Sequence, residues 1–346
     1  MGQPSQSYHK RGLLYFDQNL LKEPIEALIQ SDSYLAYRQA ISIVYSDETL
    51  REITRGTGLI DRFVRNLESF DTLRISQVME NFRPTGEYRL IPEAPSQRLK
   101  EIEEQNLLAD PDLLGLEVLH KFFGGHPSKS FHELFEEQFD ALENYLISGV
   151  RESGLSAEDE NALLSIALAP LKSVRPIFMA QSAQIEASLE EFRTRNSLLL
   201  TFRTENKIDI QKLNSITGEN IIERIWELAK KSSPAAGQLS IQKFFGMEDP
   251  NPLTGLPHTV PEKIRSVMMV LNMLGYKSDG KLSRPGKFAA SMSDLGHASW
   301  ACFCDAFITN DQGLAHRLSA TYQFLDIGTH VLKCDTSDGF EFTPAI

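Results

Sequence analysis

Strand-like sequence lies at both ends of this chain, and a long stretch of helical sequence separates the two ends. Short apolar runs occur early at Leu13–Phe16 and Ile41–Tyr45, and late at Ala306–Thr309 and Thr329–Lys333. Runs of this kind are typical of strands in a parallel sheet that helices cover on both faces. The ends must therefore either join in one sheet or form two lobes. One sheet is favoured, because about 60 N-terminal residues would bury too little surface to fold alone.

The middle of the chain has a helical pattern. Phe135, Phe139 and Leu142 recur at steps of four and three, and Ser130 with Glu133 forms a capping box at the start of that helix. The sequence therefore predicts an α/β fold with a parallel sheet flanked by helices. We expect residues 1–70 and 261–346 to build this domain, with a large all-helical insertion over residues 71–260.

Charge and composition narrow the classes of function. The chain has 35 Lys and Arg against 47 Asp and Glu, a formal net charge of −12. A generally basic nucleic-acid-binding surface is excluded, so a phosphate-binding surface must be a local patch or depend on metal ions. No apolar run approaches the roughly 20 residues needed to cross a bilayer, and the three cysteines fit reduced thiols. These features predict a cytoplasmic protein with no membrane partner.

Acidic residues lie where the predicted strands and helices meet. Asp17 directly follows the first strand, and Glu52 lies on the helix after the second. Asp294 lies on the helix that leads to the third strand, Asp305 directly precedes that strand, and Asp311 follows it. Ligands of parallel α/β sheets bind beyond the carboxyl ends of the strands, so this position favours a functional site.

Carboxylates crowded into one site repel each other and raise each other's pKa, so such a group is stable mainly with hard cations. Mg²⁺ and Mn²⁺ prefer oxygen ligands, and two such ions about 4 Å apart can promote phosphodiester hydrolysis. We expect Asp17, Glu52, Asp294 and Asp311 to hold the metal. Asp305 is expected either to be an additional ligand or to contact the ligands without touching the metal. Whether Asp294 or Asp305 is the third acid stays open.

Each acid also has an ordinary structural interpretation. Asp17 is favoured in a turn or at a helix N-cap, and Asp311 is suited to cap the helix that it precedes. Glu52 has Arg51 and Arg55 near it in sequence, which is typical of an ion-paired helix surface. These interpretations must all hold together for the acids to have no shared function.

Three segments resemble PIN-domain nucleases. Leu14–Asn19 is similar to their first strand, a hydrophobic strand that ends in Asp-x-Asn. Val44–Ser46, followed six residues after Ser46 by Glu52, is similar to their second strand. The segment Asp294–Asp311 resembles their C-terminal signature: a helical Asp, small residues, a second Asp, an apolar strand and Thr-x-Asp.

The resemblance implies a metal-dependent endonuclease in which Asp17, Glu52, Asp294 and Asp311 are the catalytic acids and Mg²⁺ or Mn²⁺ is the cofactor. It favours RNA over DNA as the substrate. It further implies a bacterial toxin or phage-defence effector, controlled by an inhibitory or activating protein partner or by a second copy bound through the helical insertion.

Five other side chains are expected to contact substrate: Asn19, Ser46, His297, Thr309 and Arg317. For His297 the alternative is a satisfied, partly buried histidine, and for Thr309 it is a role in holding the end of the strand.

Two other functions remain open from sequence. One is a non-catalytic PIN-like interaction protein whose metal site has decayed and whose helical region binds a partner. The other is a helical adaptor in which the two ends of the chain do not form one sheet.

Overall fold

The computed structural model describes most of the chain. The described residues are 11–22, 29–30, 32–55, 58–80, 83–106, 111–125, 128–190, 198–251, 255–278, 282–335 and 341–345. They divide into two compact units. Unit 1 comprises residues 1–100, 206–279 and 290–346, and unit 2 comprises residues 101–205 and 280–289.

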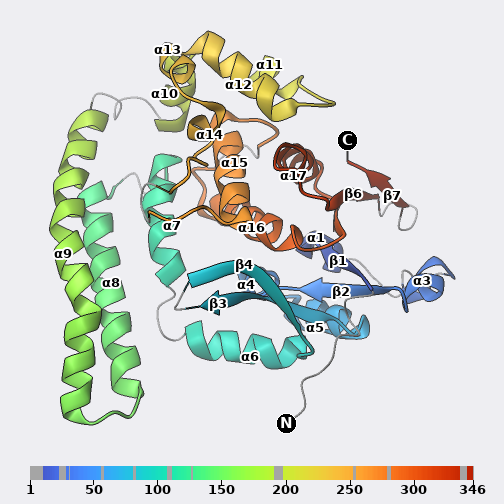
Figure 1. The fold of residues 1–346 in the computed structure, drawn as a ribbon, viewed down its shortest axis with the longest axis horizontal. Coiled ribbons are helices and arrows are strands. Elements are labelled where there is room, and N and C mark those ends of the chain that lie inside the picture. Colours follow the sequence, from blue (N-terminus) through green and yellow to red (C-terminus); the bar gives the residue numbers. More distant parts are fainter. Residues whose placement is uncertain are drawn as a thin grey trace. The chain divides into compact units, whose positions relative to one another are not determined.

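Both ends of the chain contribute strands to one sheet of seven strands in the described part of unit 1 (Figure 1). Its strands, in chain order, are β1 (Gly12–Phe16), β2 (Ile41–Tyr45), β3 (Leu73–Glu80), β4 (Arg83–Ile91), β5 (Ala306–Thr309), β6 (His330–Asp335) and β7 (Glu341–Pro344). In space the order is β4-β3-β2-β1-β5-β6-β7. The five inner strands are parallel, and the two edge strands β4 and β7 are antiparallel to their neighbours. The predicted α/β class is confirmed, and the helical adaptor is excluded because β1 pairs directly with β5.

Helices of unit 1 lie between the strands in sequence. They are α1 (Gln18–Leu21), α3 (Asp32–Tyr37), α4 (Asp47–Arg55), α5 (Ile60–Ser69), α6 (Pro95–Asn106, which continues into unit 2), α11 (Ile210–Asn214), α12 (Ile221–Ser232), α13 (Pro234–Gly237), α14 (Ile241–Phe244), α15 (Val260–Leu274), α16 (Pro285–Ala301, which begins in unit 2) and α17 (Gln312–Phe324).

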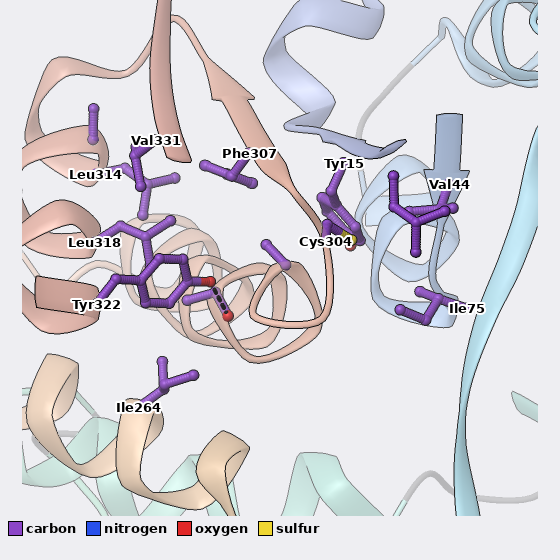
Figure 2. Close-up of a cluster of buried hydrophobic side chains, with 14 of the residues drawn as sticks. Tyr15, Val44, Ile75, Ile264, Cys304, Phe307, Leu314, Leu318, Tyr322 and Val331 are labelled. Carbon is purple, nitrogen blue, oxygen red and sulfur yellow. Dashed lines mark hydrogen bonds between the residues drawn. The ribbon is translucent and has the colours of Figure 1, made fainter. Parts of the chain in front are cut away.

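The main core lies between one face of the sheet and helices α15, α16 and α17. Figure 2 shows Leu318 and Tyr322 of α17 in the same cluster as Phe307 of β5 and Val331 of β6. The Tyr322 hydroxyl donates to the carbonyl of Ala298 in α16, which ties two of these helices together. On the other face, Phe16 packs edge-on against Phe70 after α5, with 5.6 Å between ring centroids. Covering both faces explains why the inner strands are almost wholly apolar.

Unit 2 is helical. It contains α7 (Pro111–Phe122), α8 (Phe131–Glu152), α9 (Ala157–Glu190) and α10 (Leu198–Glu205). The long helices α8 and α9 pack side by side (Figure 1). Phe135 and Phe139 of α8 both contact Phe178 of α9, and the predicted capping box of Ser130 and Glu133 opens α8. The helical periodicity thus marks the face that α8 presents to α9.

The expected insertion over residues 71–260 is too long. Strands β3 and β4 fall inside it but belong to the sheet, and residues 206–260 belong to unit 1. The separate helical unit is residues 101–205 with 280–289. The sequence of β3 mixes apolar with polar residues because its outer half is exposed, so it lacks the continuous apolar run of a central strand.

One helix also departs from the expectation about membranes. Within α9, residues 157–186 are long and apolar enough to span a bilayer by length and composition alone, and most of that segment is exposed in the structure. Its apolar residues are interrupted by Lys172 and Arg175, so no single continuous run marks it in the sequence.

Candidate metal centre

The first and the last parts of the chain meet at the carboxyl edge of the sheet. Phe16 pairs with Ile308, and the backbone N–H of Asp17 donates to the Ile308 carbonyl at 2.9 Å. This register places Asp17 beside Thr309, whose hydroxyl donates to Asp17 Oδ2 at 2.6 Å. The same Thr309 oxygen accepts the backbone N–H of Asp311 at 2.9 Å. Two residues separated by 292 positions are therefore fixed next to each other by strand pairing.

Asp17 is almost fully buried, with 2% of its surface exposed. Burial raises the pKa of this carboxyl, and His297, Thr309 and Asn19 offset part of that rise. The Asn19 side-chain amide donates to Asp17 Oδ2 at 3.3 Å. A buried carboxylate with an elevated pKa is poorly solvated, which favours a bound cation.

Glu52 and His297 complete the innermost group. Glu52 Oε2 lies 2.6 Å from His297 Nε2, across the contact between α4 and α16. Asp17, Glu52 and His297 each offer one ligand atom, and these atoms lie within 4.8 Å of one another. Burial alone would raise the pKa of Glu52, but the hydrogen bond and charge of His297 outweigh it, so the pKa is lowered. Burial alone would lower the pKa of His297, but Tyr15, Glu52 and Asp17 outweigh it, so the pKa is raised well above its usual value.

A series of buried hydrogen bonds fixes His297 on the side of the ring that faces away from Glu52. His297 Nδ1 lies 2.8 Å from the Tyr15 hydroxyl, which in turn lies 2.6 Å from Ser46 Oγ and 3.0 Å from Thr49 Oγ1. All four side chains are at most 1% exposed. Both ring nitrogens of His297 are thus engaged by side chains, and its orientation toward Glu52 is fixed.

Asp294 lies close to the same acids and is paired with Arg317. Arg317 Nη2 donates to Asp294 Oδ2 at 2.9 Å. Burial raises the pKa of Asp294 well above its usual value; Arg317 opposes this rise, while Asp17, Asp311 and Glu52 add to it. The charges of the other three predicted acids therefore act on Asp294, although it lies outside the group of Asp17, Glu52 and His297 whose ligand atoms come within 4.8 Å of one another.

Asp311 has a structural task as well. It is the N-cap of α17, and its Oδ1 accepts the backbone N–H of Leu314 at 2.7 Å. The capping interpretation and the functional one are therefore compatible, since the cap uses one carboxylate oxygen.

Four of the five expected substrate contacts are otherwise engaged. Ser46, His297 and Thr309 are fully buried, Arg317 is 2% exposed, and each is hydrogen bonded inside the protein. His297, Thr309 and Arg317 are bonded to acids of the group, whereas Ser46 is bonded to Tyr15. Contact of these four with substrate stays a prediction, which their burial does not favour. Asn19 is only partly buried and remains at the edge of the group.

Asp305 lies at the opposite edge of the sheet. Its Oδ2 accepts the backbone N–H of Leu13 at 2.7 Å, four residues before Asp17 along β1. At about 3.3 Å per strand residue, Asp305 is too far from Asp17 to share a cation with it. The expectation that Asp305 is an additional ligand is therefore wrong, and of the two candidates for the third acid only Asp294 is influenced by the charges of Asp17 and Glu52. Asp305 instead lines a separate pocket of about 520 Å³.

Sequence reasoning missed Tyr15 and Thr49, which position His297. The only signals are the place of Tyr15 two residues before Asp17, which puts both on the same face of an extended strand, and the Ser46-x-x-Thr49 spacing, which is suited to a helix start.

The donor set fits a hard divalent cation. The ligand atoms of Asp17 and Glu52 lie with that of His297 within 4.8 Å of one another, and carboxylate oxygens suit Mg²⁺ and Mn²⁺. Comparison with known proteins adds no assignment: no protein-family model, no curated protein and no solved structure matches this chain.

Proposed function

We propose that this protein is a divalent-cation-dependent nuclease with a PIN-like α/β domain. The observation that carries the proposal is the convergence of Asp17, Glu52 and His297, whose ligand atoms lie within 4.8 Å of one another. Asp294 adds a fourth side chain, whose pKa is raised chiefly by burial and further by its acidic neighbours. These residues come from distant parts of the chain, so their meeting is a property of the fold.

In this proposal Asp17, Glu52, Asp294 and Asp311 hold Mg²⁺ or Mn²⁺. The bound cation would neutralise phosphate charge and promote attack by water on the phosphodiester. His297 fixes the Glu52 carboxylate, and Thr309 fixes that of Asp17. The partly exposed Asn19 is the remaining candidate for direct contact with substrate. This use of a cation also explains how a chain of net charge −12 accepts a polyanion.

Single-stranded or structured RNA is the proposed substrate, with DNA as the alternative, and the cytoplasm is the proposed location. Unit 2 is the proposed surface for an inhibitory or activating partner or a second copy. A role as a bacterial toxin or phage-defence effector belongs to the same proposal and rests on the PIN-like sequence segments alone.

The direct test is incubation of the purified chain with labelled RNA and DNA, in Mn²⁺ or in EDTA. We expect cleavage in Mn²⁺ only. Asp311→Asn is the informative variant, because asparagine also caps helices and the substitution removes only the charge. It should lose at least about 100-fold in rate, since metal-ligand changes of this kind abolish charge stabilisation. Asp305→Asn, at the other edge of the sheet, should retain full activity.

Absence of cleavage of every substrate by the wild type, with no response to metal, would favour the non-catalytic interaction protein. Equal cleavage by Asp311→Asn and the wild type would show that the activity does not come from this site.

A further inference from the structure

A pocket of about 520 Å³ lies beside the amino ends of three parallel strands. One residue directly before each of these strands lines it: Arg11 before β1, Asp305 before β5 and Thr329 before β6. Tyr88 and Leu90 of β4 belong to the same lining, and all of these residues are in unit 1. The volume is typical of a site for a small molecule.

Asp305 is the rigidly held charged group of this pocket. Its Oδ2 accepts the backbone N–H of Leu13 at 2.7 Å, and its backbone N–H donates to the Leu13 carbonyl at 2.9 Å. Its own carbonyl accepts the backbone N–H of His330 at 2.9 Å. The residue is nevertheless exposed, and its Oδ1 has no hydrogen-bond partner in the part of the chain that the structure describes. Because a carboxylate only accepts, this oxygen needs an N–H or O–H donor from a ligand.

Two aromatic rings give the pocket a surface for a planar group. Tyr88 lies against Phe303, with 5.0 Å between the ring centroids and 36° between the ring planes, and both residues are partly exposed. Aromatic side chains stack on planar heterocycles such as nucleobases. Burial raises the pKa of Tyr88, and Cys304 and Asp305 add to the rise, so its hydroxyl is protonated at neutral pH and can donate.

The two charges of the pocket are not paired with each other. Burial raises the pKa of the Cys302 thiol to about 12 and also raises that of Cys304, so both thiols are neutral at pH 7. Arg11 and Asp305 are therefore the ionised side chains of the lining. Among the described residues Arg11 is exposed and forms no ion pair. A guanidinium in this position is available to a phosphate.

A nucleotide has a group for each of these features. Its base can stack on the rings of Tyr88 and Phe303, and its phosphate can bind Arg11. Adenine and cytosine carry an amino group, which can donate to Asp305, beside a ring nitrogen, which can accept from the Tyr88 hydroxyl. Uracil has no amino group. An aromatic amino acid has a ring and both charges, but it has no acceptor left for Tyr88 once its carboxylate binds Arg11.

We propose that this pocket binds a mononucleotide whose base carries an amino group, with adenine and cytosine nucleotides as its ligands. The inference goes beyond the proposed nuclease function. It does not depend on the metal centre, because the two sites lie at opposite ends of the strands.

The test is calorimetric titration of the full chain with AMP, CMP, UMP and tryptophan, in EDTA so that bound metal does not contribute. We expect saturable binding of AMP, of CMP or of both. UMP should bind at least about 10-fold more weakly than the better of the two, because Asp305 would lack an amino donor. Binding of neither AMP nor CMP, equal binding of UMP, or tighter binding of tryptophan would overturn the proposal.

Two variants assign the binding to this pocket. Asp305→Asn keeps an acceptor for Leu13 and removes the charge, and it should weaken nucleotide binding at least about 10-fold. Tyr88→Phe keeps the ring and removes the hydroxyl, and it should weaken binding by about 2- to 10-fold. Asp61→Asn, at an exposed position of α5 outside the pocket, is the matched control and should bind as the wild type does.

Circular dichroism checks that each variant folds. If Asp305→Asn does not fold, Tyr88→Phe and the comparison of UMP with AMP and CMP still decide. Unchanged nucleotide affinity in a folded Asp305→Asn or in Tyr88→Phe would show that the nucleotide does not bind as proposed. The nuclease proposal is tested separately, because these titrations contain no free metal.

Discussion

The centre of this site depends on a histidine that sequence analysis assigned to substrate. His297 is fully buried and bonded at both ring nitrogens, to Glu52 on one side and to Tyr15 on the other. Groups that orient ligands in this way strongly affect the affinity of metal sites. The residue-scale account is therefore that burial and hydrogen bonding, more than the identity of the acids alone, prepare the site.

Removing the His297 side chain should weaken metal binding. In His297→Ala, Glu52 loses the partner that orients it, and we expect the affinity for Mn²⁺ to fall by about 10- to 100-fold. Isothermal titration of the folded variant measures this. His316→Ala is the matched control, because His316 lies on α17 and has no contact with the four acids among the interactions that the structure describes. An unchanged affinity for Mn²⁺ in His297→Ala would show that His297 does not orient Glu52 for metal binding.

Tyr15 should matter to stability through its hydroxyl. Tyr15→Phe leaves Ser46, Thr49 and His297 without a shared buried partner, and this costs about 1–3 kcal/mol of the free energy of unfolding. Urea unfolding measures the change. Tyr37→Phe, at a residue that is 64% exposed, should change it by less than about 0.5 kcal/mol. Equal stability of the two variants would contradict a stabilising role of the buried hydrogen bonds made by the Tyr15 hydroxyl.

At the scale of elements, the sequence predicts what is locally encoded. The inner strands are continuous apolar runs, and the helix starts at Ser130 and Thr259 carry Glu three residues later. Both capping boxes form in the structure. Strand β3 was not predicted, because a strand near the sheet edge with an exposed outer half carries polar residues on that half. Local patterns thus identify buried strands and capped helices but miss partly exposed strands.

The capping box of α15 offers a test at this scale. The Thr259 hydroxyl accepts the backbone N–H of Glu262, so Thr259→Ala should lower the free energy of unfolding by about 1 kcal/mol. Thr259→Ser keeps the hydroxyl and should stay close to the wild type. Chemical denaturation followed by circular dichroism compares the three proteins. A loss in the serine variant as large as in the alanine variant would mean that the hydroxyl is not responsible.

For the whole molecule, the decisive contacts are those that no local pattern encodes. Asp17 and Thr309 are bonded across 292 positions, and Glu52 and His297 across 245. The sequence indicated that the acids gather at one sheet edge, and the fold brings Asp17 and Glu52 together there with His297. The place of Asp305 directly before β5 was the sequence signal that puts it at the amino end of a parallel strand, away from Asp17, and the structure places it there.

Stability of the whole chain should depend on pH through this group. The folded-state pKa values of Asp17, Asp294 and His297 are raised, so their contribution is present below the unfolded pKa values and is lost as pH rises through the folded ones. Glu52 acts in the opposite direction. Without metal, we expect the melting temperature to fall from pH 6 to pH 8, and the stabilisation by Mn²⁺ to be larger at pH 8 because the ion displaces protons. Asp294→Asn should flatten this dependence, and an equally steep profile in that variant would assign it to other groups.

The most direct test of the whole account is thermal unfolding of the metal-free chain with and without Mn²⁺, in the wild type, Asp17→Asn and Asp305→Asn. A ligand at about 100 times its Kd stabilises the folded state by about 2.7 kcal/mol, enough for a rise of several degrees. We predict that rise for the wild type and Asp305→Asn and its absence in Asp17→Asn. The same rise in Asp17→Asn, or none in the wild type, would contradict a cation site at the carboxyl edge of this sheet.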